Sequence, residues 1–343
     1  MSSALPYATE RLAALAAVQL ASKATRQIQP AQATTLVKTD TSPVTVADYA
    51  AQTLVSHHLS LSFPDIPLVA EEDAKDLGSS ACAALRQQVL QCVNSVLSTP
   101  MTNSQVRMLR AIERGGHAGG PKGRYWVLDP VDGTKGFLRG QQYAICLALI
   151  EEGQVKLGVL GCPRLPLHGV TMDPAEEEEK SSGTLVAAVQ DQGAYQYALN
   201  GDTKGGERIY CAEVASTADA TFCEGVETAH SSHDTHAAIA QEARVVRAPA
   251  RLDSQCKYAV VARGDADIYL RIPTRPGYVE KIWDHAAGAL IVQEAGGKVC
   301  DVDGKPLDFS QGRRLESNRG IIATASTIHS TILQATRSVL AKS

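Results

Sequence analysis

The turn that follows a short apolar run near residue 128 constrains this chain more than any other feature. The run ends at Leu128 and predicts a buried strand, and the sequence Asp-Pro-Val-Asp-Gly-Thr follows at once at residues 129–134. Proline fixes the backbone after Asp129, while Gly133 lets it bend sharply. The segment therefore brings two carboxylates, those of Asp129 and Asp132, to the end of one strand.

Two carboxylates in one small space repel each other unless a cation joins them. Hard oxygen ligands select magnesium, and the backbone amides from Gly133 onwards could cradle a phosphate at the start of a helix. The same sequence is also ordinary for an aspartate-rich β-turn, because Asp-Pro and Asp-Gly pairs are common in turns. Taken alone, the segment leaves a metal site and a plain turn equally open.

Three more carboxylates have a structural explanation beside a catalytic one. Glu71 opens the acidic run 71–73 after a short apolar strand, where a solvated loop start is the commoner outcome. Asp284 lies near the start of an apolar helix, where capping or compensation of the helix dipole would explain it. Thr45 and Asp48 have the spacing of a capping box, with aspartate in the place of glutamate.

Composition restricts the classes of function. The 343-residue chain has a formal net charge of -4, which argues against nucleic-acid binding through a broad basic surface, although a few cations could hold a small anion. No apolar run approaches the roughly 20 residues of a membrane span. The eight cysteines form no Cys-x-x-Cys pair, so we expect free thiols in a reducing compartment. The alanine-rich N-terminus could be a transit peptide, but its helical repeat and Glu10 favour an ordinary helix and a cytoplasmic protein.

The periodicity of apolar residues predicts two units, 1–212 and 213–343. The first has an α+β pattern, with helices from about Thr45 and over 80–97 and an antiparallel meander after Tyr125. Its first helix is expected to bury one face, formed by Leu12, Leu15, Ala16 and Leu20. The second unit alternates strands and helices, and its helices are expected at 233–242, 258–262, 282–294 and 327–340. The segment 98–124 reads as partly loop.

Together these segments resemble one known family. Residues 129–134 and 283–288, the latter Trp-Asp-His-Ala-Ala-Gly, look like the two signature motifs of the inositol monophosphatase and fructose bisphosphatase superfamily. More narrowly, the chain is similar to the 3′(2′),5′-bisphosphate nucleotidases of the yeast salt-tolerance type at residues 42–52, 230–234, 252–258 and 266–271. The pattern departs at Ala70, where glycine is usual, and at Asp73, where serine is common. Neither departure removes an implied ligand.

The resemblance implies an α/β fold, a layered α/β/α/β/α sandwich of the sugar-phosphatase type, with metal ions between two domains. It implies two or three Mg²⁺ per site, held by Glu71, Asp129, Asp132, Asp284 and the carbonyl of Val131. It also implies that Asp48 and the hydroxyl of Thr134 orient and deprotonate the attacking water.

Substrate recognition is implied for Thr134, His230, Ser254, Lys257 and Arg271. Lys257 and Arg271 are suitable cations for a second phosphate, and arginine can grip it with two hydrogen bonds. Without the resemblance, an exposed positive surface would be the preferred interpretation of these two cations. The spacing of His230, His233 and His236 is a weak signal for zinc.

The implied reaction is hydrolysis of the 3′-phosphate of adenosine 3′,5′-bisphosphate to AMP and phosphate. A second substrate, 3′-phosphoadenylyl sulfate, inhibition by lithium, and a link to sulfur assimilation and salt tolerance follow from the same resemblance. The chemistry agrees, because divalent ions neutralise the phosphate and supply a hydroxide in line, so no side-chain nucleophile is required. We expect a cytoplasmic monomer that acts on a small nucleotide bisphosphate, with no nucleic-acid or membrane partner.

Two other functions are open. A phosphatase for inositol monophosphate or inositol 1,4-bisphosphate would use the same metal ligands, but a monophosphate would leave Lys257 and Arg271 without an anionic partner. A catalytically silent nucleotide-binding regulator would have lost a metal ligand or a water activator, and this sequence keeps all of them.

Overall fold

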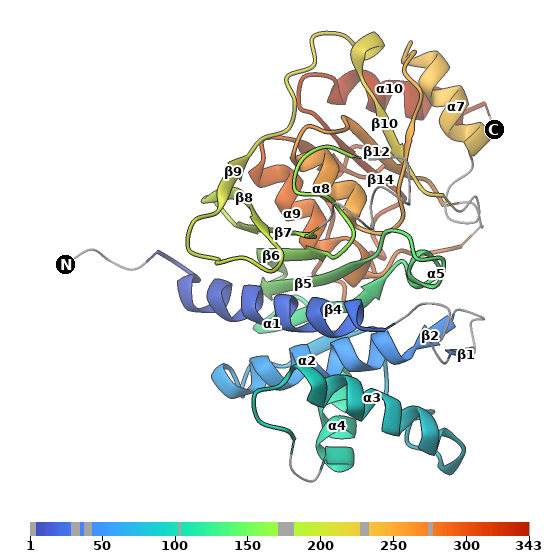
Figure 1. Ribbon diagram of the computed structural model, residues 1–343. Helices are drawn as coiled ribbons and strands as arrows, with labels where there is room; N and C mark the ends of the chain where they lie inside the picture. The colour runs from blue at the N-terminus through green and yellow to red at the C-terminus, as the bar shows by residue number, and fades with distance from the viewer. Residues whose placement is uncertain are drawn as a thin grey trace.

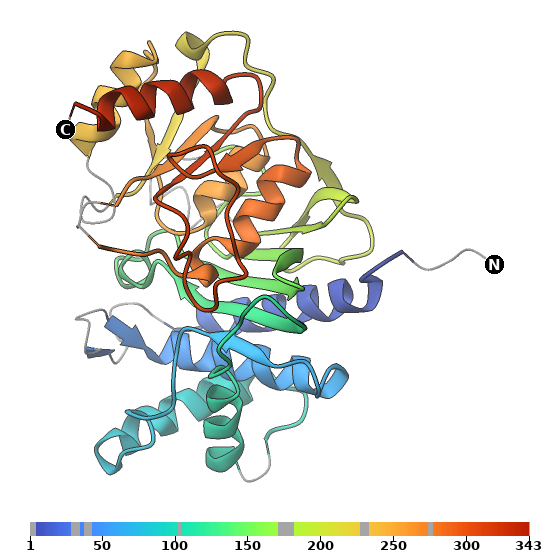
Figure 2. The same ribbon diagram turned by 180° about the vertical axis from the view of Figure 1, so that it is seen from behind.

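Two β-sheets alternate with layers of helices in this protein, as Figure 1 shows. The computed structural model describes residues 5–28, 35–37, 43–101, 104–170, 182–226, 233–273 and 277–342. The large sheet is covered by helices from the N-terminal part of the chain on one face, and two helices separate it from the small sheet (Figures 1 and 2). Two more helices cover the far face of the small sheet.

The N-terminal helices cover the first face of the large sheet. Helices α1 (Ala8–Arg26) and α2 (Val46–Ser62) pack on each other and on the sheet, and α3 (Ala83–Val96) and α4 (Ser104–Glu113) lie beyond α2. The apolar face of α2, formed by Ala47, Ala51, Leu54, Val55 and Leu59, is buried. The prediction for Leu12 was wrong, since its side chain is 52% exposed. The buried stripe of α1 is Ala14, Leu15, Ala17, Val18 and Ala21, whose small side chains allow a close approach to the sheet.

The large sheet is a meander, as the sequence predicted. It has seven strands in the order β3-β4-β5-β6-β7-β8-β9, with β3 parallel to β4 and every other neighbour antiparallel. The strands are β3 (Leu68–Ala70), β4 (Arg124–Asp132), β5 (Ala144–Glu151), β6 (Gln154–Cys162), β7 (Thr184–Val189), β8 (Gly193–Ala198) and β9 (Glu207–Ile209). A separate hairpin, β1 (Thr35–Val37) and β2 (Pro43–Thr45), precedes α2.

The small sheet has five strands in the order β11-β10-β12-β14-β13. These are β10 (Phe222–Glu224), β11 (Ala250–Arg251), β12 (Ile268–Arg271), β13 (Lys298–Cys300) and β14 (Ile321–Thr324). Helices α7 (His233–Glu242) and α10 (His329–Leu340) cover its outer face. The last strand of the large sheet ends before residue 212, and the first strand of the small sheet begins after it. The division of the chain into two domains at this residue stays a prediction.

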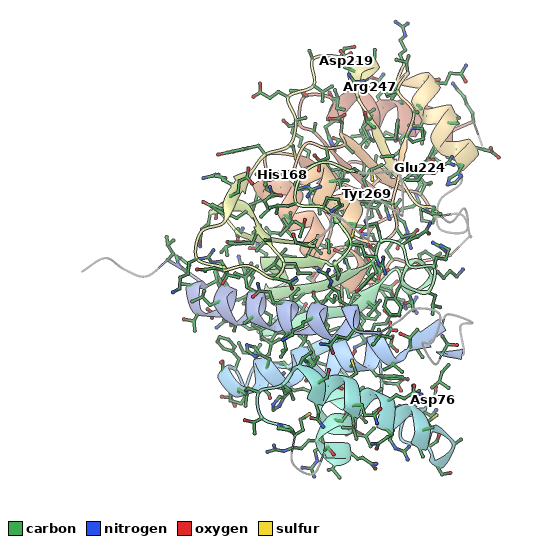
Figure 3. The ribbon with its side chains drawn as sticks, viewed as in Figure 1. Asp76, His168, Asp219, Glu224, Arg247 and Tyr269 are labelled. Carbon is green, nitrogen blue, oxygen red and sulfur yellow. The ribbon has the colours of Figure 1, made fainter. Side chains whose placement is uncertain are left out.

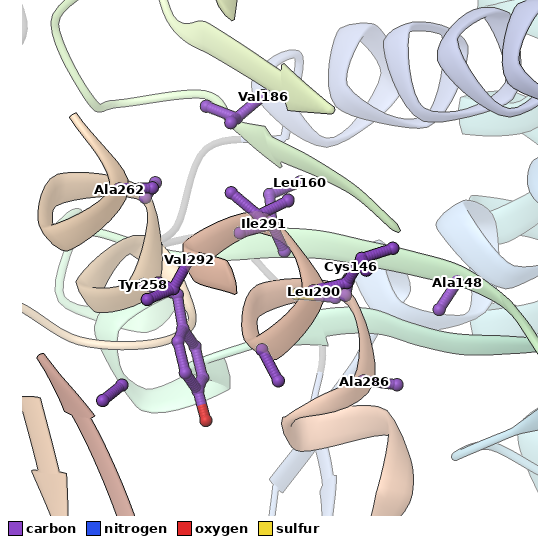
Figure 4. Packing of buried hydrophobic residues seen from close by; sticks show 14 of the residues in the cluster. Cys146, Ala148, Leu160, Val186, Tyr258, Ala262, Ala286, Leu290, Ile291 and Val292 are labelled. Atoms are coloured by element: carbon purple, nitrogen blue, oxygen red, sulfur yellow. The ribbon is translucent and has the colours of Figure 1, made fainter. Parts of the chain in front are cut away.

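A continuous core joins the two sheets. Helices α8 (Cys256–Ala262) and α9 (Ala286–Glu294) lie between them, and one buried cluster contains residues of both helices and both sheets. Figure 4 shows Leu290 and Ile291 of α9 against Cys146 and Leu160 of the large sheet. Helix α9 is therefore held against strands β5 to β8, and α8 against β6.

Three local predictions need correction. The helix expected at 282–294 is broken, because a 3-10 turn, Ile282–Asp284, precedes α9. The helix expected at 80–97 likewise opens with a 3-10 turn, Ser80–Cys82. The loop-like segment 98–124 contains helix α4, which was not predicted. All eight cysteines are free thiols, as expected. In the described ranges no helix is long and apolar enough to cross a membrane.

Glycines allow both faces of strand β6 to be packed closely. A Cβ on Gly158 would lie 2.7 Å from the carbonyl oxygen of Ala287 in α9, and one on Gly161 would lie 2.5 Å from Cγ1 of Val18 in α1. Since these are contacts with helices on opposite sides of the sheet, one strand sets the spacing of both layers.

We expect Gly158→Ala to lower the free energy of unfolding by about 1–3 kcal/mol, because the added methyl group must push α9 away from the sheet. Urea unfolding followed by circular dichroism measures this. Gly205→Ala is the matched control, as a Cβ there would meet nothing within 4 Å, and it should change stability by less than about 0.5 kcal/mol. Equal stability of the two variants would contradict the close approach of α9.

Candidate active site

A β-bulge brings Asp129 and Asp132 to the same side of the large sheet. In a regular strand, residues three apart face opposite sides. Here Asp129 pairs with Cys146 and Asp132 pairs with Ala144, so that three steps along β4 correspond to two along β5. The extra residue of the bulge turns the side chain of Asp132 to the same side of the sheet as that of Asp129. Gly133 then adopts φ 88° and starts the short helix α5 (Thr134–Leu138).

Glu71 lies beside this turn because β3 and β4 are parallel. Parallel neighbours end at the same edge of a sheet, and the amide of Glu71 donates a hydrogen bond to the carbonyl oxygen of Leu128 at 3.3 Å. Asp284 comes from the 3-10 turn before α9, which contacts β4 and β5. The alternative that Asp284 caps this helix is wrong, since the N-cap is His285 and no side chain caps it.

The charges of these carboxylates act on one another. Burial, then the charges of Glu71, Asp132 and Asp284, raise the pKa of Asp129 well above its ordinary value. Burial also raises the pKa of Asp284, and Asp132 adds to the effect. The pKa of Asp132 is raised by burial to about 6, although Lys257, the amide of Gln255 and Arg271 oppose the shift.

This donor set fits a divalent cation. Carboxylates that raise one another's pKa would be stabilised as anions by a metal ion, and oxygen-only ligands suit Mg²⁺. The carbonyl oxygen of Val131 lies in the same turn and accepts a hydrogen bond from Thr134 Oγ1 at 3.2 Å.

A second group could also hold a metal. Among the described residues, the three whose potential ligand atoms lie within 4.8 Å of one another are Glu280, Asp284 and His285. However, Glu280 already binds Arg271 at 3.0 Å and His285 at 3.2 Å. A carboxylate whose charge is offset by arginine is a weak metal ligand, so we do not assign Glu280 to the metal site.

Asp48 takes part both in the capping box of α2 and in a contact with Thr134 of the candidate active site. Its Oδ2 accepts hydrogen bonds from the amide and the hydroxyl of Thr45, at 2.8 and 2.7 Å, and completes the capping box of α2. Its Oδ1 accepts from Thr134 Oγ1 at 3.4 Å. Asp48 is 1% exposed. The two roles are compatible because each uses a different oxygen.

The candidate substrate residues lie next to the turn. Ser254 has φ 65°, and a Cβ on Gly133 would be 3.0 Å from its Cβ. The ammonium of Lys257 lies 5.3 Å from the ring centre of Tyr269, which Figure 3 shows on the small sheet. Lys257 is 7% exposed, and the side chain of Arg271 is 17% exposed. The alternative of an exposed positive surface is therefore wrong for both.

The histidine segment gives little support to zinc. His230 lies outside the described residues. His233 Nε2 lies 3.0 Å from the carbonyl oxygen of Gly225, and His236 Nδ1 lies 3.5 Å from Glu224. Among the described residues, neither of these histidines belongs to the candidate metal group of Glu280, Asp284 and His285.

Gln255 links the two halves of the site, and no role was predicted for it, although it lies in the matching segment 252–258. Its amide donates to Asp132 Oδ2 at 2.5 Å. Its side chain donates to the carbonyl oxygen of Trp283 at 2.7 Å and accepts from the amide of Gly288 at 3.0 Å. One residue thereby fixes the turn of β4 relative to the segment that carries Asp284.

Arg313 makes a second such link from a loop with no recognisable motif. It donates to the carbonyl oxygen of Ala70 at 2.5 Å and to those of Gly115 and His117 at 3.1 and 3.0 Å. Its guanidinium lies 4.8 Å from the ring centre of Trp283. It therefore connects the segment before Glu71 to the residue before Asp284.

Comparison with known proteins identifies the family. The profile of the inositol monophosphatase family matches residues 6–341. The chain belongs to the inositol monophosphatase family. Within it, the chain is 42% identical to a 3′(2′),5′-bisphosphate nucleotidase of Schizosaccharomyces pombe over 98% of each protein. It is 43% identical to a protein of the same name from Oryza sativa, covering 98% of this chain and 95% of the relative.

Solved structures of inositol monophosphatases confirm the predicted layered α/β fold. The IMPase of Thermotoga maritima superposes with a TM-score of 0.64 at 23% identity, over 97% of this chain and 99% of the other. The inositol monophosphatase of Anabaena gives a TM-score of 0.60 at 18% identity, over 96% and 95%. Inositol monophosphatases are generally metal-dependent, in agreement with the donor set described above.

We expect Mg²⁺ to stabilise the protein more at pH 7.5 than at pH 5. The raised pKa of Asp132, about 6, means that the folded metal-free protein binds protons more tightly than the unfolded chain, so its stability falls as pH rises from about 4 to 6. Above pH 6 a bound cation would neutralise the carboxylates that repel one another, whereas at pH 5 the cation competes with protons for them. Mg²⁺ at about 10 to 100 times its dissociation constant should add about 1.4–2.7 kcal/mol at pH 7.5.

Thermal unfolding with and without Mg²⁺ at both pH values measures this effect. Asp132→Asn is the control. It should be more stable than the unaltered metal-free protein at pH 7.5 and should respond less to Mg²⁺. An equal response of the unaltered protein at the two pH values would contradict the coupling between protons and the cation.

Proposed function

We propose that this chain is a magnesium-dependent 3′(2′),5′-bisphosphate nucleotidase, which hydrolyses adenosine 3′,5′-bisphosphate to AMP and phosphate. Relatives that carry this name are 42–43% identical over nearly the whole chain. The observation that carries the proposal is the pair of buried cations, Lys257 and Arg271, beside the carboxylates. Lys257 lies two residues after Gln255, whose amide binds Asp132 Oδ2 at 2.5 Å. Arg271 pairs with Glu280, which has a carboxylate oxygen within 4.8 Å of one of Asp284.

The carboxylates supply the part of the site common to phosphomonoesterases. Glu71, Asp129, Asp132, Asp284 and the carbonyl of Val131 would hold two or three Mg²⁺. Bound Mg²⁺ supplies charge neutralisation for the phosphate and lowers the pKa of a water molecule. The turn at Gly133 is followed by the start of α5, whose first backbone amides would suit a phosphate oxygen.

Asp48 and Thr134 would position and deprotonate the attacking water. Thr134 Oγ1 has one proton and two acceptors within reach, the carbonyl oxygen of Val131 and Asp48 Oδ1. If the Val131 carbonyl held a metal ion, the proton would go to Asp48, and the hydroxyl oxygen could accept a hydrogen bond from water. Asp48 is held rigidly, because its second oxygen receives two hydrogen bonds from Thr45. A base whose position is fixed by the start of α2 loses little freedom when the substrate binds.

Lys257 and Arg271 would bind the 5′-phosphate. Two cations that are nearly buried need anionic partners. Of these two cations, Glu280 pairs with Arg271 alone, and the metal carboxylates would offer little negative charge to Lys257 once Mg²⁺ is bound. A second phosphate satisfies both cations, whereas inositol monophosphate does not. The alternative of an inositol phosphatase is less well supported for this reason. The silent regulator is not supported, because the ligands and the Asp48–Thr134 pair are all present.

The proposal extends to 3′-phosphoadenylyl sulfate as a second substrate, because its sulfated 5′ end is also anionic. It also extends to inhibition by lithium, which would replace one Mg²⁺, and to a role in sulfur assimilation and salt tolerance. His230 would contribute to the same nucleotide site, together with Ser254. We keep the proposal of a cytoplasmic monomer with no nucleic-acid or membrane partner.

Phosphate release from adenosine 3′,5′-bisphosphate and inositol 1-phosphate, measured side by side with Mg²⁺, tests the function. We expect much faster release from the nucleotide, and suppression of it by lithium. A preference for the inositol ester would keep the metal chemistry and overturn the substrate. No release from either compound would favour the regulator.

We expect Asp48→Asn to reduce kcat by about a hundredfold or more, in the range of lost acid–base catalysis. Nucleotide binding should persist, and so should the fold, because the amide oxygen of asparagine can accept the hydrogen bonds of Thr45. Single-turnover kinetics and calorimetric binding of the nucleotide separate the two effects, and thermal unfolding is the control for the capping box. Unchanged turnover would exclude Asp48 as the base.

A further inference from the structure

A buried carboxylate with no assigned role lies behind Arg271. Glu280 is 2% exposed and follows the small sheet in the segment 277–281. Its Oε1 accepts a hydrogen bond from Arg271 Nε at 3.0 Å, and its Oε2 lies 3.2 Å from His285 Nε2. The side chains of Arg271 and Glu280 are 17% and 3% exposed, so this is a largely desolvated ion pair.

Glu280 is itself held in place by a chain of side chains from two helices. His285 Nδ1 lies 2.9 Å from the hydroxyl of Tyr258, in α8. The carboxylate of Glu280 can only accept, so His285 carries its proton on Nε2 and donates it there, and Nδ1 accepts from the Tyr258 hydroxyl. Tyr258 packs edge-on against Tyr269, with ring centres 4.8 Å apart. Because all four side chains are buried, the position of the carboxylate is fixed on two sides.

The contact with Glu280 uses the inner nitrogen of the guanidinium. A hydrogen bond to Nε fixes the plane of the group, and the phenol of Tyr278 also forms a hydrogen bond with the guanidinium. The two Nη groups, the pair that grips phosphate oxygens, lie at the other edge. Glu280, which Arg271 contacts, has a carboxylate oxygen within 4.8 Å of an oxygen of Asp284, so the guanidinium lies close to the metal carboxylates. A phosphate bound by Arg271 would thus lie a short distance from the phosphate to be hydrolysed.

We propose that Glu280 is a positioning residue that sets the preference for a doubly phosphorylated nucleotide, by fixing the orientation of Arg271. The inference rests on the proposed function, in which Arg271 binds the 5′-phosphate. Glu280 does not touch the substrate. A field effect would have the opposite sign, because removal of a negative charge behind Arg271 would strengthen its attraction for an anion.

The experiment compares adenosine 3′,5′-bisphosphate with adenosine 3′-monophosphate, which differ by the 5′-phosphate alone. The measured quantity is the ratio of kcat/KM for the bisphosphate to kcat/KM for the monophosphate. We expect Glu280→Gln, which cannot accept from Arg271 and His285 at once, to lower this ratio about tenfold. The loss should fall on KM for the bisphosphate, and kcat/KM for the monophosphate should stay within about twofold.

A double-mutant cycle connects the effect to Arg271. In an Arg271→Met background, Glu280→Gln should cause no further loss in the ratio, because the group that it positions is gone. Glu280→Asp is a second variant, with the charge retained on a side chain too short to keep both contacts. It should also lower the ratio, and it keeps the test available if Glu280→Gln does not fold.

Asp265→Asn is the matched control. This substitution removes the carboxylate that pairs with Arg263, whose side chain is 4% exposed. Arg263 lies at the C-terminal end of α8, whereas Lys257 lies near its N-terminal end. Asp265→Asn should leave the substrate ratio unchanged. An equal loss on both substrates for Glu280→Gln, a raised ratio, or additivity with Arg271→Met would each overturn the role of Glu280. If Arg271→Met itself left the ratio unchanged, the proposed 5′-phosphate site would fail, and this inference with it.

Discussion

Repulsion among buried carboxylates is the constraint on which the rest of this structure depends. Asp129 and Asp284 are each raised in pKa by burial and by neighbouring acids, and a site of this kind is costly to keep without positive charge. Positive charges offset part of this repulsion. Lys257, Arg271 and the amide of Gln255 lower the pKa of Asp132, and Arg271 also lowers that of Asp284. These cations belong to the proposed nucleotide phosphate site, and metal ions are proposed to neutralise the remaining carboxylates.

Holding such a site together requires rigid connections between segments that are far apart in the chain. The bulge in β4 supplies two acids, the end of β3 supplies Glu71, and the 3-10 turn before α9 supplies Asp284. Close packing of α9 on Gly158 fixes the distance between these elements. Gln255 and Arg313 then tie the segments to one another by hydrogen bonds to backbone carbonyl groups. Main-chain contacts of this kind suit a site whose own side chains repel.

Local sequence patterns predicted the helices and strands more successfully than they predicted the contacts between them. The capping box at Thr45, the meander and helix 233–242 each depend on neighbouring residues, and all three are present. The expected burial of Leu12 failed because a helical repeat cannot tell which of two adjacent stripes meets the sheet. The break before α9 was missed because the apolar pattern of 282–294 is continuous through the 3-10 turn.

By itself, the sequence determined the chemistry that is available: paired acids on a proline-fixed turn, further acids near Glu71 and Asp284, and a small number of cations. Those properties are local, because they depend on residue type and spacing. Only the tertiary structure decided that Asp129 and Asp132 face the same side, since the bulge is defined by pairing with β5. It also decided that Glu280 lies behind Arg271, because burial in a shared core, and not nearness in sequence, brings a carboxylate and a guanidinium together.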